Sequence, residues 1–121
     1  MSVTDTLIIG NQGHEQHRAA ILHAVRSGQP EPAARLDFAS LDDAWTILSP
    51  KRRSILTVMA DSGPMTIREI ARRAGRDVHA VHRDVRVLAH AGVIDKTADG
   101  RMILPYKTIK FDFTLTARQV A

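Results

Sequence analysis

Histidine and arginine side chains recur at helical spacing between residues 78 and 91, and they share one side of the expected helix. At about 100° per residue, Val78, Val81, Val85 and Leu88 fall on the opposite side and are expected to face the core. The exposed side then presents a mixed set: His79, Ala80, Arg83, Arg86, Val87 and His90, with His82 on the flank. Cationic and hydrogen-bonding groups on such a face can bond base edges in the major groove of DNA.

Four residues in the first half of this helix are the candidates for base reading. We expect Arg83 to contribute most, because a planar guanidinium can bond O6 and N7 of guanine together. His79 and His82 can donate to bases or phosphates, and Ala80 can touch a thymine methyl group.

Further cations stand on neighbouring segments, where they are expected to meet the phosphate backbone. The phosphate candidates are Lys51, Arg52, Arg53, Arg72, Arg73, Arg76 and Arg86, and the candidates on an expected hairpin are Lys96 and Arg101. The alternative is that these cations pair with Glu69, Asp84 or Asp95 on a solvated face.

Four helices that position these groups are predicted from their capping signals. Ser40 with Asp43 can cap a helix that carries Leu41, Trp45 and Leu48 on one face. Ser49 followed by Pro50 starts a second helix, which extends to residue 61. The other signals are a capping box at Thr66 and Glu69, an N-cap at Asp77, and left-handed C-caps at Gly75 and Gly92. They bound helices over residues 67–74 and 78–91.

Strand patterns lie on both sides of these helices. The ranges 93–97 and 101–104 flank a Gly-containing turn and predict a hairpin, and residues 108–115 alternate strictly between apolar and polar side chains. The range 3–9 predicts a strand, 14–27 a helix and 29–35 a linker. The strands 3–9 and 108–115 are expected to pair, within one chain or across a two-fold axis.

These elements predict an α+β fold, namely a winged helix-turn-helix with an N-terminal strand-helix and an additional C-terminal strand. Residues 37–104 would form the DNA-binding domain. Residues 1–36 would serve dimerisation or partner binding, and residues 105–121 would form the C-terminal strand and tail.

Several segments together resemble small prokaryotic winged-helix transcriptional regulators over roughly residues 37–115. The segments that carry the resemblance are Pro50-Lys51-Arg52, Ile67 to Arg73, Gly75 to Val78, Val81 to Val85, and Leu88 with Ala91 to Ile94. Pro105-Tyr106 and Phe111 to Phe113 also fit. The pattern of Leu88 and Ala91 to Ile94 is general to repressors of the arsenical and multidrug-resistance types. The resemblance implies DNA-binding transcriptional control, and an antitoxin role because such genes often neighbour toxin-like genes.

Composition narrows the function classes. The 121 residues carry a formal net charge of +4, and residues 51–101 contain eleven Lys or Arg against six Asp or Glu, whereas residues 1–50 are acidic. This distribution favours a polyanion partner for the middle segment. No apolar run is long enough to span a membrane, so a cytoplasmic protein is expected. With no cysteine and 4% aromatic residues, disulfides, thiolate metal sites and base-stacking single-strand binding are disfavoured.

Catalysis and metal binding are not expected. The pairs His14 with His17 and His79 with His82 have metal-ligand spacing, but neither has a convincing third ligand, so we expect no metal and no cofactor. No nucleophile motif, phosphate loop or carboxylate cluster predicts an enzyme. Trp45, Phe111 and Phe113 are expected in the core.

The leading hypothesis is a homodimeric, sequence-specific regulator of double-stranded DNA, a repressor of its own or a neighbouring operon. The alternative is an antitoxin-type interaction protein that binds and neutralises a toxin encoded next to it, with DNA autoregulation secondary. The acidic residues 1–50 suit a basic protein partner.

Overall fold

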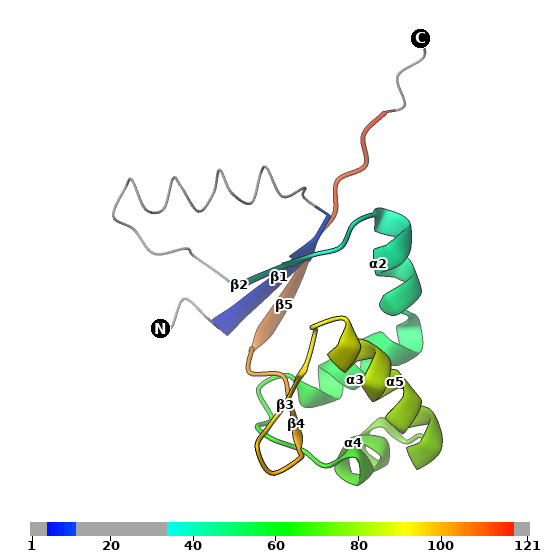
Figure 1. Ribbon diagram of the computed structural model, residues 1–121, viewed down its shortest axis with the longest axis vertical. Coiled ribbons are helices and arrows are strands. Elements are labelled where there is room, and N and C mark those ends of the chain that lie inside the picture. The colour runs from blue at the N-terminus through cyan, green and yellow to red at the C-terminus, as the bar shows by residue number, and fades with distance from the viewer. Residues whose placement is uncertain (1–4, 12–33, 118–121) are drawn as a thin grey trace, which may run out of the picture. The chain divides into compact units, whose positions relative to one another are not determined.

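The computed structural model describes residues 5–11 and 34–117, and its elements make an α+β protein (Figure 1). Two compact units divide the chain. One unit comprises Trp45–Thr108, and the other comprises the described residues of Met1–Ala44 and Ile109–Ala121. Helix α2 (Leu41–Ile47) crosses the boundary between the two units.

The larger unit begins with three helices whose first turns are capped as their sequences predict. The Ser49 hydroxyl accepts a bond from the Arg52 amide at the start of α3 (Pro50–Met59). At α4 (Ile67–Ala74), the Thr66 hydroxyl accepts from the Glu69 amide, and the Glu69 carboxylate accepts from the Thr66 amide. Since each cap satisfies an amide that has no partner inside the helix, the predicted helix starts are confirmed.

Helix α5 (Val78–His90) follows α4 after a turn of three residues. Gly75 lies in the left-handed region with φ of 65°, and the Arg76 amide behind it bonds the Ala71 carbonyl at 3.0 Å. Gly92 ends α5 in the same manner, with φ of 85° and a bond from the Val93 amide to the Leu88 carbonyl. Both predicted glycine stops are confirmed, because a side chain at either position would be strained.

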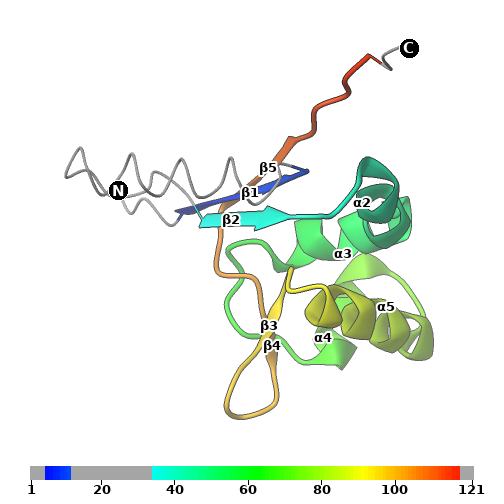
Figure 2. The same cartoon turned by 45° about the horizontal axis from the view of Figure 1, so that its top comes forward.

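A short hairpin completes this unit, as Figure 2 shows. Strand β3 (Asp95–Lys96) pairs antiparallel with β4 (Met102–Ile103), and the Thr97 amide bonds the Arg101 carbonyl across the turn. Met65, in the segment between α3 and α4, exchanges two backbone hydrogen bonds with Met102 at 2.8 and 2.9 Å. The hairpin is thereby attached to the segment that enters α4.

One apolar core holds the helices and the hairpin together. The apolar side of α5 is buried at Val81, Val85 and Leu88, and partly at Val78. The other buried apolar residues of this unit come from α3, α4, β4 and the segments between the elements: Leu48, Ile55, Leu56, Met59, Met65, Ile70, Ala71, Val93, Ile94, Met102 and Leu104. Complete burial of a leucine or isoleucine stabilises the folded state by about 1.5–3 kcal/mol, so this core dominates the stability of the unit.

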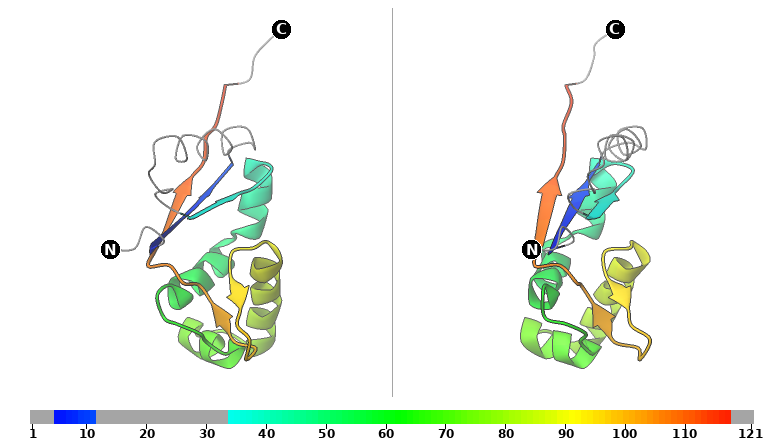
Figure 3. Two further views of the ribbon diagram at one scale, coloured as in Figure 1. Left: turned by 60° about the vertical axis from the view of Figure 1, so that its left-hand side comes forward. Right: turned by 90° about the vertical axis from the view of Figure 1, so that its left-hand side faces the viewer.

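The other unit contains a three-stranded sheet in the order β2–β1–β5, and Figure 3 shows β1 (Thr6–Gly10) in its middle. Strand β2 (Ala34–Asp37) runs parallel to β1, with Leu7 opposite Ala34 and Gly10 opposite Asp37. Strand β5 (Thr108–Asp112) lies on the other side of β1. The predicted pairing of the first strand with the last is confirmed within one chain.

The carboxyl ends of β1 and β5 lie together. The Asn11 carboxamide donates to the Thr114 carbonyl and accepts from the Thr114 amide, both at 2.9 Å. This side chain therefore continues the hydrogen bonding between the two strands by one residue beyond the end of β1. A Cβ at Gly10 would lie 2.6 Å from the Asp112 carbonyl oxygen. The two strands run in the same direction. Glycine is therefore required at position 10, because a side chain there would prevent β1 and β5 from approaching each other.

Several expectations differ from the structure, and one cannot be compared. The helix expected over 50–61 ends at Met59, and the strand expected over 108–115 ends at Asp112. Residues 34 and 35 belong to β2 instead of a linker. Their backbone pairing with β1 makes them part of a strand, and their own sequence does not signal this pairing. Trp45 is 50% exposed and Phe111 is 41% exposed, so both predictions of core positions are wrong. The buried residue of α2 is Ala44, and Trp45 next to it lies on another side of the helix, while Phe111 lies on an edge strand. The predicted helix 14–27 lies outside the described residues.

Candidate nucleic-acid interface

The side of α5 that faces away from the core carries the predicted cationic groups. His79, Arg83, Arg86 and His90 are all exposed, and His82 is exposed on the flank, while Ala80 is half-buried. In the described part of the chain, no carboxylate lies within 4 Å of the Arg83 or Arg86 guanidinium. These two positive charges are available to an anionic partner.

The start of α5 is held by Asp77. One oxygen of its carboxylate accepts from the His79 amide at 3.0 Å and from the Ala80 amide at 3.1 Å. A carboxylate at this position also interacts favourably with the helix dipole. The first turn of α5, which carries two of the base-reading candidates, therefore has a fixed backbone.

Asp84 joins three segments through its two carboxylate oxygens. One oxygen accepts from Arg52 Nε of α3 at 3.1 Å, and the other accepts from Arg76 Nη2 of the α4–α5 turn at 2.7 Å. The three side chains are only 15–22% exposed, so solvent screens these pairs less than it screens surface pairs. Two of the predicted phosphate candidates, Arg52 and Arg76, are thus engaged inside the protein.

Arginines of α3 also bond the end of α2. Arg52 Nη1 donates to the Thr46 and Ile47 carbonyls at 3.0 and 3.3 Å, and Arg53 Nη1 donates to the Leu48 carbonyl at 2.6 Å. Carbonyls at a helix end have no partner within the helix, so both arginines have a structural role there.

The remaining predicted cations are exposed. Lys51 lies in the first turn of α3, Arg72 and Arg73 lie in the last turn of α4, and Lys96 lies on β3. No carboxylate of the described segments lies within 4 Å of these four groups. Sequence reasoning did not select Arg68 of α4, which is exposed in the same way.

The turn of the hairpin is organised around Asp99. The hydroxyl of Thr97 and the amide of Arg101 donate to its carboxylate, and these bonds lower the pKa of Asp99 below its ordinary value. The Arg101 guanidinium lies 3.3 Å from the same carboxylate, with both side chains at least half exposed. Since such pairs contribute little to stability, Arg101 can exchange Asp99 for another anion.

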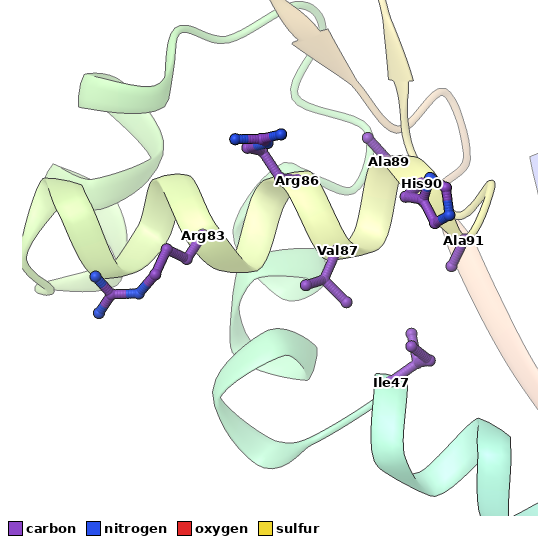
Figure 4. Close-up of a pocket in the computed structure, with 7 residues that line it drawn as sticks. All are labelled: Ile47, Arg83, Arg86, Val87, Ala89, His90 and Ala91. Carbon is purple, nitrogen blue, oxygen red and sulfur yellow. The ribbon is translucent and has the colours of Figure 1, made fainter.

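A shallow groove runs along the second half of α5, and Figure 4 shows its lining residues. Arg83 and Arg86 line it beside the apolar side chains of Val87 and Ile47, with His90 at the end of the helix. The picture shows Val87 directed toward Ile47 while Arg83 extends away from the helix. The lining of the groove thus combines apolar side chains with two arginines and a histidine.

Metal ligands do not gather in the described segments. Among residues 5–11 and 34–117, no three His, Cys, Asp or Glu side chains are placed to hold a metal ion. The pair His79 and His82 lies on α5 without a third ligand, and His14 with His17 lies outside the described residues.

The fold and the site define a small α+β protein that presents a cationic helix face. The family model of HVO_A0114 matches residues 47–111, which is more than half of the chain, so the protein belongs to the HVO_A0114 family. A comparison with curated proteins finds no match. Within the described segments, no helix is long and apolar enough to cross a membrane.

Proposed function

We propose that this protein binds double-stranded DNA by placing the exposed face of α5 in the major groove. The observation that carries the proposal is the set of exposed hydrogen-bonding groups on that face, where Arg83 and Arg86 have no carboxylate of the described residues within 4 Å. A guanidinium without an internal partner can bond guanine or phosphate without first breaking an ion pair.

The order of elements supports a winged helix-turn-helix. Helix α4, a turn containing Gly75, and the longer α5 would form the helix-turn-helix, and β3–β4 would form the wing. The bonds between Met65 and Met102 attach this hairpin to the segment before α4, which gives the wing a fixed root. On this proposal, Lys96 and Arg101 of the hairpin reach the DNA beside the groove that α5 occupies.

The cations divide into two roles under the proposal. Lys51, Arg72, Arg73 and Arg86 would contact phosphates, because they are exposed and have no internal ion pair with the described residues. Arg52 and Arg76 would position α5 through Asp84 instead of meeting the DNA. We propose that the protein acts as a repressor of its own or a neighbouring operon, for which an operator next to its gene is the first target to test.

The test is a binding titration with labelled DNA from upstream of the protein's own gene. Arg83→Ala should weaken the specific complex by about 1–3 kcal/mol, as expected for the loss of a bidentate contact to guanine. Lys107→Ala is the matched control, because Lys107 is exposed, lies outside the helices and hairpin, and removes the same charge. For Lys107→Ala, the loss of affinity for the upstream DNA should be no greater than its loss of affinity for random-sequence DNA.

Two results would contradict the proposal. Absence of any complex at low salt would exclude DNA binding, since the electrostatic part of the affinity is largest there. Equal losses for Arg83→Ala and Lys107→Ala would show that α5 does not read the sequence.

A further inference from the structure

The outer edge of β5 is the surface that the function proposed above leaves unused. In the described part of the chain the sheet ends at β5, whose only neighbouring strand is β1. Phe111 is 41% exposed on this strand, and Lys110 is exposed. An edge strand with open backbone groups is a template for pairing with another strand.

The backbone bonds of Thr114 show which residues face this outer edge. Both its amide and its carbonyl point to the β1 side, where they bond the Asn11 side chain, and the Asp112 carbonyl also lies against Gly10. Backbone groups of successive residues in a strand point to opposite edges, and those of every second residue point to the same edge. The amides and carbonyls of Ile109 and Phe111 are therefore directed outward.

The charges of β5 are complementary to those of its own antiparallel copy. We propose that two copies of this chain join through β5, antiparallel, with the two-fold axis at Phe111. In that register Lys110 of each copy lies opposite Asp112 of the other, so two ion pairs form on one face of the joined strands. Phe111 faces its own counterpart, and Ile109 faces Phe113, on the other face.

Charge also excludes the neighbouring registers. An axis at Lys110 would place two lysines opposite each other, and an axis at Asp112 would place two aspartates opposite each other. Like charges directly opposite destabilise a strand pair. Neither Lys110 nor Asp112 has an ion-pair partner within 4 Å among the residues described, so both remain available to the second copy.

The outward backbone groups agree with this register. Phe111 and its counterpart would form a hydrogen-bonded pair, because both expose an amide and a carbonyl at the outer edge. Lys110 and Asp112 would then occupy non-hydrogen-bonded pairs, in which side chains approach more closely. The inference names the surface through which the proposed regulator would become a dimer, and it depends on no contact with DNA.

The first experiment exchanges the charges and measures mass by sedimentation equilibrium. The natural chain should be a dimer at micromolar concentration, and Lys110→Asp and Asp112→Lys should each raise the dimer dissociation constant about tenfold or more, because every pair becomes repulsive. An equimolar mixture of the two variants should form a heterodimer, in which both pairs are attractive again. Lys107→Asp, with the same change in charge next to β5, should remain a dimer.

The second experiment tests the register with introduced cysteines, since the natural chain has none. Phe111→Cys should form an intermolecular disulfide on mild oxidation, because the Cα atoms of a hydrogen-bonded pair lie about 5.5 Å apart. Ile109→Cys is the control, because its counterpart would lie four residues away along the strand, about 13 Å. Equal crosslinking of both variants would overturn the register.

The proposal as a whole is overturned by a monomeric natural chain, or by charge variants that do not recombine on mixing. Mass and crosslinking report only on β5. The proposed DNA binding is tested by Arg83→Ala, so failure of one proposal is distinguishable from failure of the other.

Discussion

Helix α5 and strand β5 both carry a regular row of apolar side chains, but only one of these rows is buried. Val81 and Leu88 of α5 are completely buried, whereas Phe111 of β5 is 41% exposed and Leu115, just beyond that strand, is 83% exposed. The polar sides differ as well. On α5 they carry two arginines, Arg83 and Arg86, with no carboxylate of the described residues within 4 Å, and on β5 they alternate in sign between Lys110 and Asp112.

The difference shows that a periodic pattern identifies a face but does not say what covers it. The apolar face of α5 is covered by the core of its own unit, so the opposite face is left for a partner. On β5 the partly exposed apolar face and the charged face both lie at the end of a sheet, so the edge itself is the available surface. Substitutions on α5 and near β5 test this difference, because their effects on stability and binding should depend on what covers each face.

The largest effect is expected for Leu88→Ala in α5. The side chain is completely buried, so its truncation should lower the free energy of unfolding by about 2–5 kcal/mol through lost burial and a cavity. Urea denaturation followed by circular dichroism measures the change. A loss below about 1 kcal/mol would mean that the core closes around the smaller side chain.

An intermediate effect is expected for Asp84→Asn on the flank of α5. Asparagine keeps the size of the side chain but removes the charge that holds Arg52 and Arg76, which should cost about 1–3 kcal/mol of stability. Removal of a negative charge alone would strengthen DNA binding, whereas a loss of α5 positioning would weaken specific binding.

On the proposed function, we expect the positioning effect to dominate, so Asp84→Asn should bind the proposed target DNA more weakly despite a more positive charge. The matched control is Asp95→Asn, because Asp95 is exposed and forms no ion pair with the described residues. Stability and affinity equal to those of this control would show that the network positions nothing.

The smallest effect is expected for Leu115→Ser, beyond the end of β5. With 83% of the leucine exposed, unfolding free energy should change by no more than about 0.5 kcal/mol. The urea experiment applied to Leu88→Ala measures it on the same scale. A loss above about 1 kcal/mol would indicate that this side chain is covered in solution.

The helices were predictable from sequence because their signals are local. The starts of α3, α4 and α5 each have a capping side chain that bonds an amide two or three residues ahead, from Ser49, Thr66 and Asp77. Gly75 ends α4 because it adopts the left-handed backbone conformation that the C-cap needs. The cationic face of α5 followed from the same periodicity, since burial of Val81, Val85 and Leu88 leaves the other side of the helix exposed.

The remainder depends on contacts between distant residues. Strand β2 has Arg35 and Asp37 at alternate positions, where they pair with each other at 3.0 Å, and only the register with β1 makes the segment a strand. The sequence left two interpretations of Arg52 and Arg76, contact with DNA phosphates or pairing with a carboxylate such as Asp84. Which cations bond a carboxylate depends on the packing of α3 against α5, and no sequence spacing reports it.

The two hydrogen bonds between Asn11 and Thr114 join residues that are 103 positions apart in the chain. At about 5–20 residues per second, roughly 5–20 s pass between the synthesis of β1 and that of β5. All contacts within Trp45–Thr108 become possible earlier, because that unit is one continuous segment. The nascent chain can therefore complete its helical unit while the sheet still lacks its last strand.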